Sequence, residues 1–296
     1  MNVFHLESRF KRYALYERGM RVPSYKAIWS EVCALATFTA TNQLSTWTTA
    51  VVRAYLIEGR MSKDWSAKTF RNKWQSLKSF LDWCVREAYI DQNPIKAITR
   101  PKLGARLPRC LSPGDAKKLL ASALWYPWRS PWERARNLAI LATLMMTGVR
   151  LSELLLLGIT DVDTNAGLIT VHHGKGNKER MIPIYPRLMP ILCDYHKQKQ
   201  LYGKPSQWFF TGLHSSKRLY PKDVRRICKT ISKTANVMFT PHMLRHTFAR
   251  ELADNNMDVM KIKELLGHAQ VTTTQMYIAV SMRSMIKSIN DIRMYR

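Results

Sequence analysis

The sequence predicts a mainly α-helical protein of two domains, with a small β-sheet in the C-terminal domain. Three observations predict this fold. Apolar residues recur at helical spacing through the first hundred residues. A basic, proline-containing stretch without periodicity follows, and short apolar runs beside glycine-containing turns then indicate strands near residues 159–184. A chain of 296 residues is long enough to bury a core in each of two domains.

The first domain is expected to consist of helices at about 24–38, at 46–57 and after the capping residue Ser66. The third helix shows the clearest apolar stripe, formed by Phe70, Trp74, Leu77, Leu81, Cys84, Val85 and Ala88. Opposite this stripe lies a basic face that could follow a DNA backbone or simply be solvated, formed by Lys68, Arg71, Lys73 and Lys78. The tryptophans of this region are predicted to be core residues, namely Trp29, Trp47, Trp74 and Trp83.

A linker separates the two predicted domains. Residues 91–109 hold three prolines, one glycine and five Lys or Arg residues, and prolines discourage helix. A new helix is expected after Ser112, with Pro113 in its first turn and Asp115 completing a capping pattern. We therefore predict a helical domain at 1–100, a basic linker at 101–110 and a second domain at 111–296.

Charge indicates a polyanionic partner. The formal net charge is +26 and the sequence pI is about 10.2, far beyond what solubility requires. Residues 1–105 hold 17 Lys and Arg against 8 Asp and Glu, and the remainder holds 30 against 13. Because both parts are basic, both are expected to contact the polyanion, and a single basic tail is excluded.

The cysteines and the hydropathy favour a cytoplasmic protein. The five cysteines are widely spaced and form no C-x-x-C pair, so a disulfide framework and structural zinc are both poor interpretations. No apolar run approaches the roughly 20 residues that span a bilayer, and the N-terminus lacks a signal-peptide core. We expect no membrane partner.

Two basic residues in the middle of the second domain are candidate site residues. A strongly apolar helix at 133–146 leads to Arg150, whose anionic partner could equally be Glu153 or a phosphate. Strands are expected at 159–163, at 168–173 and at 181–184. Between them lies Lys175, flanked by glycines in G-K-G-N-K-E-R, which could donate a proton, contact a phosphate or be a surface turn residue.

The stretch from Thr240 to Tyr277 holds the densest group of candidates. His242 and Arg245 are three residues apart and share one face of a helix, whereas His246 is expected to point elsewhere and to be structural. His268 follows a helix end at Leu265-Leu266-Gly267, and Tyr277 comes nine residues later.

These residue types suit chemistry on a phosphodiester. Arginines can hold its non-bridging oxygens by charge-assisted hydrogen bonds, which strengthen as charge develops on phosphorus. A tyrosine has a free pKa of about 10, so an imidazole or a cationic field must help it to act as a nucleophile. Lys175 is placed to protonate the leaving oxygen. The sequence shows neither a carboxylate cluster with metal-ligand spacing nor a Walker-type phosphate loop, so we expect no cofactor and no metal.

At these positions the chain resembles the tyrosine recombinase (phage integrase) family. The resemblance covers most of residues 108–280 and rests on the strings T-G-V-R-L-S-E-L, G-K-G-N-K-E-R, P-H-M-L-R-H-T-F-A and L-L-G-H-(x8)-Y. At this length the chain resembles the compact Xer-like group. The resemblance implies a two-domain DNA clamp, in which a helical core-binding domain precedes the catalytic domain.

The resemblance also implies a mechanism. Tyr277 would attack the scissile phosphate to give a 3′-phosphotyrosyl link, Arg150 and Arg245 would clamp that phosphate, and Lys175 would protonate the leaving 5′ oxygen. His242 and His268 would assist proton movement and hydrogen bonding, and strands would exchange through a Holliday junction without a cofactor.

The expected partners follow from the same resemblance. They are double-stranded DNA with paired inverted half-sites and further copies of the chain, which form a homotetramer on two DNA sites through a C-terminal helix at about 281–296. An accessory protein or a partner recombinase would be compatible with this assembly. The candidate DNA contacts are Lys68, Arg71, Lys73, Lys78, Lys102, Arg106, Lys178, Arg225 and Arg226. We expect a nucleoid-associated protein encoded by a bacterium, a phage or another mobile element.

The function implied is site-specific recombination, for integration and excision of a mobile element or for resolution of a plasmid or chromosome dimer. Two alternatives have to be weighed against it. A type IB topoisomerase uses similar chemistry but relaxes supercoils as a monomer. A DNA-binding protein could also keep the fold without catalysis, although the six catalytic positions are all filled.

Overall fold

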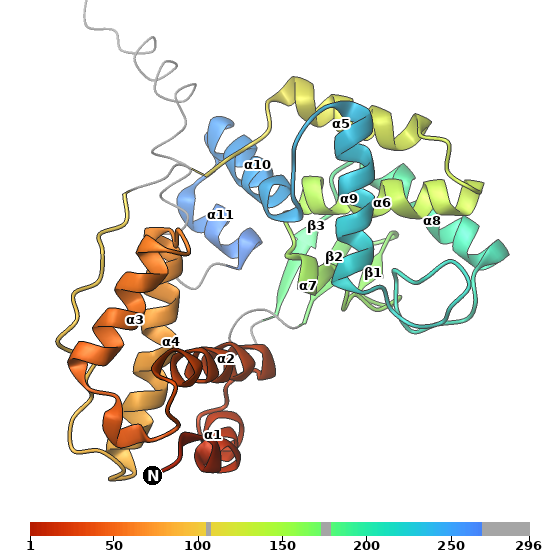
Figure 1. Ribbon diagram of the computed structural model, residues 1–296. Helices are drawn as coiled ribbons and strands as arrows, with labels where there is room; N and C mark the ends of the chain where they lie inside the picture. The colour runs from red at the N-terminus through yellow and green to blue at the C-terminus, as the bar shows by residue number, and fades with distance from the viewer. Residues whose placement is uncertain (105–107, 173–178, 268–296) are drawn as a thin grey trace, which may run out of the picture. The chain divides into compact units, whose positions relative to one another are not determined.

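The computed structural model describes residues 1–104, 108–172 and 179–267 (Figure 1). The chain divides into two compact units, Met1–Ala105 and Arg106–Arg296. Each unit has its own hydrophobic core. The described residues are mainly helical, and their one three-stranded sheet lies in the second unit, so the predicted fold class is confirmed.

The first unit is entirely helical in its described part. Its elements are the 3-10 helix η1 (Val3–Leu6), α1 (Glu7–Arg12), the π-helical turn η2 (Tyr13–Glu17), α2 (Val22–Thr39), the 3-10 helix η3 (Leu44–Thr46), α3 (Thr49–Met61) and α4 (Ala67–Arg86). Ser66 caps α4 as predicted, because its hydroxyl accepts a hydrogen bond from the Thr69 amide at 3.1 Å. The short helices before residue 18 were not predicted, since they are too short to show a full apolar stripe.

Aromatic rings form the centre of the first unit's core. The Phe10 ring lies 5.2 Å, centroid to centroid, from both Phe80 and Trp83. The four tryptophans predicted to be core residues are all buried, with at most 9% of their surface exposed. Their rings are therefore not available for stacking on bases.

The second unit is a helical body with a small sheet. Its elements are α5 (Pro113–Trp125), α6 (Pro131–Thr147), α7 (Leu151–Leu154), β1 (Val162–Asp163), β2 (Leu168–Val171), β3 (Arg180–Pro183), α8 (Met189–Tyr202), α9 (Pro221–Ala235), α10 (Pro241–Asp254) and α11 (Val259–Leu266). Ser112 caps α5 as expected, because its hydroxyl accepts a hydrogen bond from the Asp115 amide at 3.0 Å.

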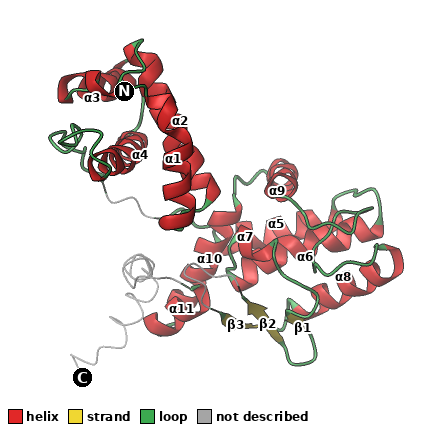
Figure 2. Cartoon of the chain, turned by 90° about the horizontal axis from the view of Figure 1, so that it is seen from below, coloured by secondary structure: helices red, strands yellow, loops and turns green. Residues whose placement is uncertain are grey.

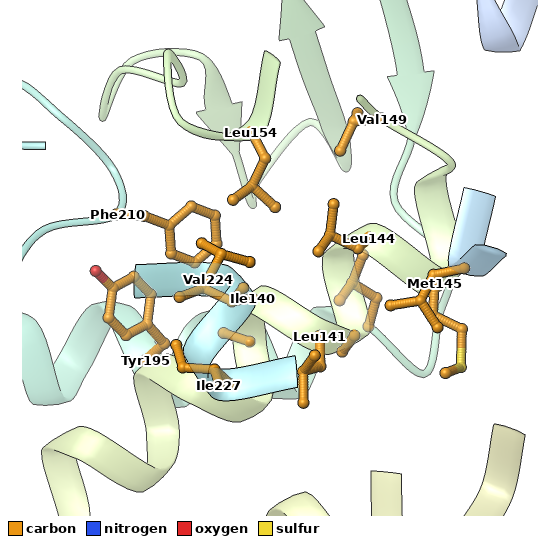
Figure 3. Packing of buried hydrophobic residues seen from close by; sticks show 14 of the residues in the cluster. Ile140, Leu141, Leu144, Met145, Val149, Leu154, Tyr195, Phe210, Val224 and Ile227 are labelled. Carbon is orange, nitrogen blue, oxygen red and sulfur yellow. The ribbon is translucent and has the colours of Figure 1, made fainter. Parts of the chain in front are cut away.

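Helix α6 lies at the centre of the second unit. Almost every residue from Ala135 to Met145 is buried, and the helix packs against α5, α8 and α10 (Figure 2). Figure 3 shows Ile140 and Leu144 of α6 among side chains from α7, α8 and α9. A helix that is buried on nearly all sides lies inside a domain, even though α6 includes the polar residues Arg136, Asn137 and Thr143. The C-terminal end of α6 is therefore held in place by the core, and it fixes the position of the turn that begins at Gly148.

The sheet is antiparallel, in the order β1-β2-β3. Ile169 of β2 pairs with Val162 on one side and with Ile182 on the other. The first two strands are shorter than predicted, and hydrogen bonds of aspartate side chains at both ends of β1 account for its shortness. Asp161 accepts a hydrogen bond from the Gly158 amide at 2.7 Å, and Asp163 accepts from two amides of the turn to β2.

Among residues 1–104, 108–172 and 179–267, no helix combines the length and the apolar character needed to cross a membrane.

Candidate active site

Arg150 is positioned by the turn that joins α6 to α7. Helix α6 ends at Thr147, and Gly148 turns the chain with φ of 63°. A Cβ atom at Gly148 would lie 2.5 Å from Cδ1 of Phe248, so a side chain at this position would clash. Arg150 follows as the N-terminal cap of α7, and its side chain is 28% exposed.

Arg245 is positioned by helix α10. Thr240 caps this helix by accepting a hydrogen bond from the Met243 amide at 3.2 Å. Arg245 lies one turn into the helix and is only 2% exposed. Its guanidinium donates to the carbonyl oxygen of Gly148 at 2.6 Å, which ties α10 to the turn before Arg150.

Three arginines converge on the C-terminal end of α11. The last carbonyls of a helix have no partner within it and carry the negative end of its dipole, so cations are favoured there. Each arginine comes from a different element and donates to a different carbonyl. The three bonds are Arg180 Nε to Leu265 O at 2.8 Å, Arg245 Nη2 to Leu266 O at 2.7 Å and Arg150 Nη2 to Gly267 O at 2.8 Å.

Glu153 is the carboxylate of this cluster, and it is 3% exposed. Arg150 Nη1 donates to its Oε1 at 2.7 Å, and Arg180 Nη2 donates to its Oε2 at 2.7 Å. Burial acts to raise the pKa of Glu153, but the hydrogen bonds and charges of Arg180 and Arg150 outweigh it and lower that pKa. Glu153 is therefore ionised at neutral pH. Counting only the residues that the structure describes, three guanidinium groups against one carboxylate leave an excess of two positive charges in the cluster. Such a site favours a phosphate.

His242 faces the same cluster with a neutral ring. Burial, followed by the charges of Arg245 and Arg150, lowers the pKa of His242 below its ordinary value. The His242 ring is only partly covered, so it still reaches the surface, and a neutral imidazole can accept a proton as well as donate a hydrogen bond.

The expectation that His246 points elsewhere on the helix was wrong. Residues four apart on a helix share a face, and the rings of His242 and His246 lie 4.3 Å apart, centroid to centroid. Burial, then the charges of His242 and Arg245, lower the pKa of His246 to about 4. His246 is thus a neutral, packed neighbour of His242.

The structure brings Arg150, His242 and Arg245 together, and it adds two residues that the sequence analysis did not assign to the site. Glu153 had been considered only as a partner for Arg150, and Arg180 had not been considered. The sequence holds one signal that could have pointed to Arg180. It is a charged residue at the start of an apolar strand, R-M-I-P. Lys175, His268 and Tyr277 lie outside the described residues, as does the expected C-terminal helix.

The candidate DNA contacts differ in their surroundings. Lys73 forms an ion pair with Glu31 at 2.5 Å, and Lys78 is paired with Asp82. The exposed candidates in the described residues are Lys68, Lys102, Arg225 and Arg226, of which Arg226 lies 3.7 Å from Asp223, while Arg71 is half-buried. Arg106 and Lys178 lie outside the described residues. No group of three or more His, Cys, Asp or Glu side chains in the described part of the chain is arranged to hold a metal ion.

Comparison with known proteins decides the family. Residues 116–284 match the model of the phage integrase family, a span that contains all six predicted catalytic positions. The chain belongs to the phage integrase family.

Curated relatives of this integrase family member extend the match over most of its length. It is 34% identical over 244 residues to the tyrosine recombinase XerC of Thermodesulfovibrio yellowstonii, covering 80% of this chain and 79% of the relative. It is 30% identical over 274 residues to XerC of Escherichia coli O157:H7, covering 91% of this chain and 89% of the relative. The protein is therefore a tyrosine recombinase, an enzyme of site-specific DNA recombination, as predicted, and the relatives do not support the alternatives.

Solved structures show the same fold. A XerH recombinase in a post-cleavage complex with its difH substrate aligns with a TM-score of 0.77 and 22% identity, covering 96% of this chain and 84% of that one. The Tn1549 transposon integrase in complex with a circular-intermediate DNA aligns with a TM-score of 0.76 and 19% identity, covering 97% and 99%.

Proposed function

We propose that this recombinase cleaves DNA with Tyr277 as nucleophile, and that Arg150 and Arg245 clamp the scissile phosphate. The observation that carries the proposal is the meeting of both arginines at the end of α11, where the cluster has an excess of two positive charges. His268 follows Gly267 directly in the sequence, and Tyr277 comes nine residues later. The nucleophile is thus within a short length of chain from the clamp.

The proposed reaction is balanced without a cofactor. The Tyr277 oxygen loses its proton and forms a bond to phosphorus, while the bond from phosphorus to the 5′ oxygen breaks. Lys175 gives the leaving oxygen its proton, and neutral His242 together with His268 assists proton movement. A 5′ hydroxyl of the partner strand then attacks the phosphotyrosine, releases Tyr277 and joins the exchanged strands in a Holliday junction.

The clamp accelerates the reaction because it binds the transition state more strongly than the substrate. Negative charge builds on the non-bridging oxygens as phosphorus becomes five-coordinate, and fixed donors need no reorganisation at that moment. The carbonyls of Gly148, Leu266 and Gly267 hold the two guanidinium groups before DNA arrives. Preorganised donors of this kind typically each contribute about 100- to 1,000-fold in rate.

We further propose that the first unit is the core-binding domain and that both units contact double-stranded DNA. The charge distribution supports this, since each part of the chain carries a large excess of Lys and Arg. Lys68, Lys102, Arg225 and Arg226 are the exposed candidates. The assembly would be a tetramer on two sites with paired inverted half-sites, joined through residues 281–296, in the cytoplasm of a bacterium.

Trapping on a nicked suicide substrate, which loses the short strand carrying the 5′ hydroxyl, tests the proposal. The wild-type protein should form a covalent adduct on the 3′ phosphate, and Tyr277→Phe should form none. Tyr202→Phe, which changes an exposed tyrosine of α8, is the matched control and should react as the wild type does. An equal adduct yield from wild type and Tyr277→Phe would refute the proposed nucleophile.

A further inference from the structure

Arg180 occupies an unusual position for a residue with no assigned role. It opens β3, five residues after Lys175 in the sequence, and its side chain is only 7% exposed. All three of its guanidinium nitrogens donate to protein groups. Nη1 and Nη2 bind the two carboxylate oxygens of Glu153 at 3.1 and 2.7 Å, and Nε binds the carbonyl of Leu265 at 2.8 Å.

The carboxylate that Arg180 holds is the one that orients Arg150. Glu153 Oε1 also accepts from Arg150 Nη1 at 2.7 Å, and Oε2 also accepts from the Arg150 amide at 2.8 Å. Four donors fill the roughly four acceptor sites of one carboxylate. Because Arg180 binds both of its oxygens, the Glu153 carboxylate is held in one orientation for its bonds to Arg150.

Arg180 also packs against the turn that ends α11. Gly267 has φ of 63°, and a Cβ atom there would lie 2.9 Å from Nη1 and 3.2 Å from Cζ of Arg180. The Gly267 carbonyl is the one that accepts from Arg150 Nη2. One arginine thus touches both groups that hold Arg150, namely the Glu153 carboxylate and the Gly267 turn.

We propose that Arg180 is a positioning residue for strand cleavage, which fixes Arg150 for its contact with the scissile phosphate by holding Glu153 and the end of α11. This inference rests on the proposed role of Arg150 as a phosphate clamp. Arg180 acts through these protein groups in this proposal and not through a DNA contact of its own, since its side chain is only 7% exposed and its three nitrogens each donate to the protein. A buried ion pair with only a stabilising role is the competing explanation.

A methylphosphonate substrate separates these two explanations. Replacing one non-bridging oxygen by a methyl group removes the negative charge of the phosphate, so cleavage depends far less on a cationic clamp. A variant whose clamp is misplaced should therefore lose more activity on the phosphodiester than on the methylphosphonate. A variant that only unfolds more easily loses activity equally on both, because an unfolded molecule cleaves neither.

Two variants test Arg180. Arg180→Lys keeps the positive charge but loses the planar guanidinium that binds both carboxylate oxygens, and Arg180→Gln loses the charge. We expect single-turnover cleavage of the phosphodiester to fall by about 10- to 100-fold, by analogy with the loss that follows removal of a partner that orients a metal ligand. On the methylphosphonate the loss should be less than about threefold, by the same reasoning, and the affinity for DNA should be unchanged. Arg134→Lys, an exposed arginine of α6, is the matched control and should cleave both substrates as the wild type does.

Arg150→Ala distinguishes failure of this inference from failure of the proposed function. If Arg150→Ala shows the selective loss on the phosphodiester and both Arg180 variants do not, the clamp stands and the role of Arg180 is overturned. Equal losses on the two substrates in the Arg180 variants would also overturn it. If Arg150→Ala itself cleaves the phosphodiester normally, the proposed clamp fails.

Discussion

Arg245 is the most constrained residue of the site, since it is buried in α10 and donates to the carbonyls of Gly148 and Leu266. Arg245→Lys should lower single-turnover cleavage by about 100- to 1,000-fold, because a single ammonium nitrogen cannot occupy the separate positions of Nη1 and Nη2 and lacks the planar geometry that binds a phosphate through two donors. Arg250→Lys on the same helix, where the arginine pairs with Asp254, is the control. Comparable cleavage by the two variants would contradict the clamp.

His246 should make the protein less stable in mild acid. Its pKa is about 4 in the folded chain, whereas an unperturbed histidine has a pKa of about 6.5. Because the unfolded state binds more protons between these values, the free energy of unfolding should fall as pH drops from about 6.5 to 4, by less than the roughly 3.4 kcal/mol that this difference in pKa represents, since the ring is partly open to solvent.

Urea denaturation at several pH values measures this effect. His246→Gln should lose less stability than the wild type across the same window, since it has no proton to bind. An identical pH profile for the two proteins would show that His246 is not held neutral.

The pKa of His172 is shifted in the opposite direction to that of His246, so it should affect stability at higher pH. Its Nδ1 lies 3.0 Å from Glu179 Oε1 and its Nε2 lies 3.0 Å from Asp161 Oδ1, and the contact with Glu179 is the main cause that raises the pKa of His172. Any stability that this contact adds is present below about pH 6.5 and is lost as pH rises through the raised pKa. A titration followed by NMR should give a pKa above about 6.5 for His172 and a lower value in Glu179→Gln. No difference between the two proteins would contradict this assignment.

At the scale of elements, the turn between α6 and α7 is the critical connection. Gly148→Ala should destabilise the fold by about 1–3 kcal/mol, because φ is positive and the new methyl group would lie 2.5 Å from Phe248. Gly114→Ala in α5 is the control: its nearest neighbour would be Ser112 Oγ at 3.8 Å, and alanine favours a helix. Urea midpoints measure both, and equal stability of the two variants would contradict the clash.

The elements were more predictable from sequence than the contacts between them. Ser66 and Ser112 mark the start of α4 and α5 by their own chemistry, and the stripe of α4 sets the face that it buries. Arg180 could not be found in the same way. Its partners Glu153 and Leu265 lie 27 and 85 residues away in sequence, so only the folded second unit brings them together.

At the scale of the whole molecule, both parts of the chain carry an excess of positive charge, which suits the proposed binding of DNA by both units. Binding should weaken steeply with salt, because each neutralised phosphate releases counterions and contributes about −0.9 to the slope of log K against log salt concentration. Lys68→Ala and Arg225→Ala, one in each unit, should each make that slope shallower by about one. Lys73→Ala should change the slope less, since Lys73 is paired with Glu31. A flat salt response would contradict binding by both units.

The central claim is that Tyr277 forms the covalent bond to DNA beside the clamp made by Arg150 and Arg245. The most direct measurement is mass spectrometry of the trapped adduct after digestion with trypsin. Residues 264–283 form one tryptic peptide, in which Tyr277 is the only tyrosine. The account predicts a 3′-phosphorylated nucleotide attached to this peptide at Tyr277, and attachment at any other residue would contradict it.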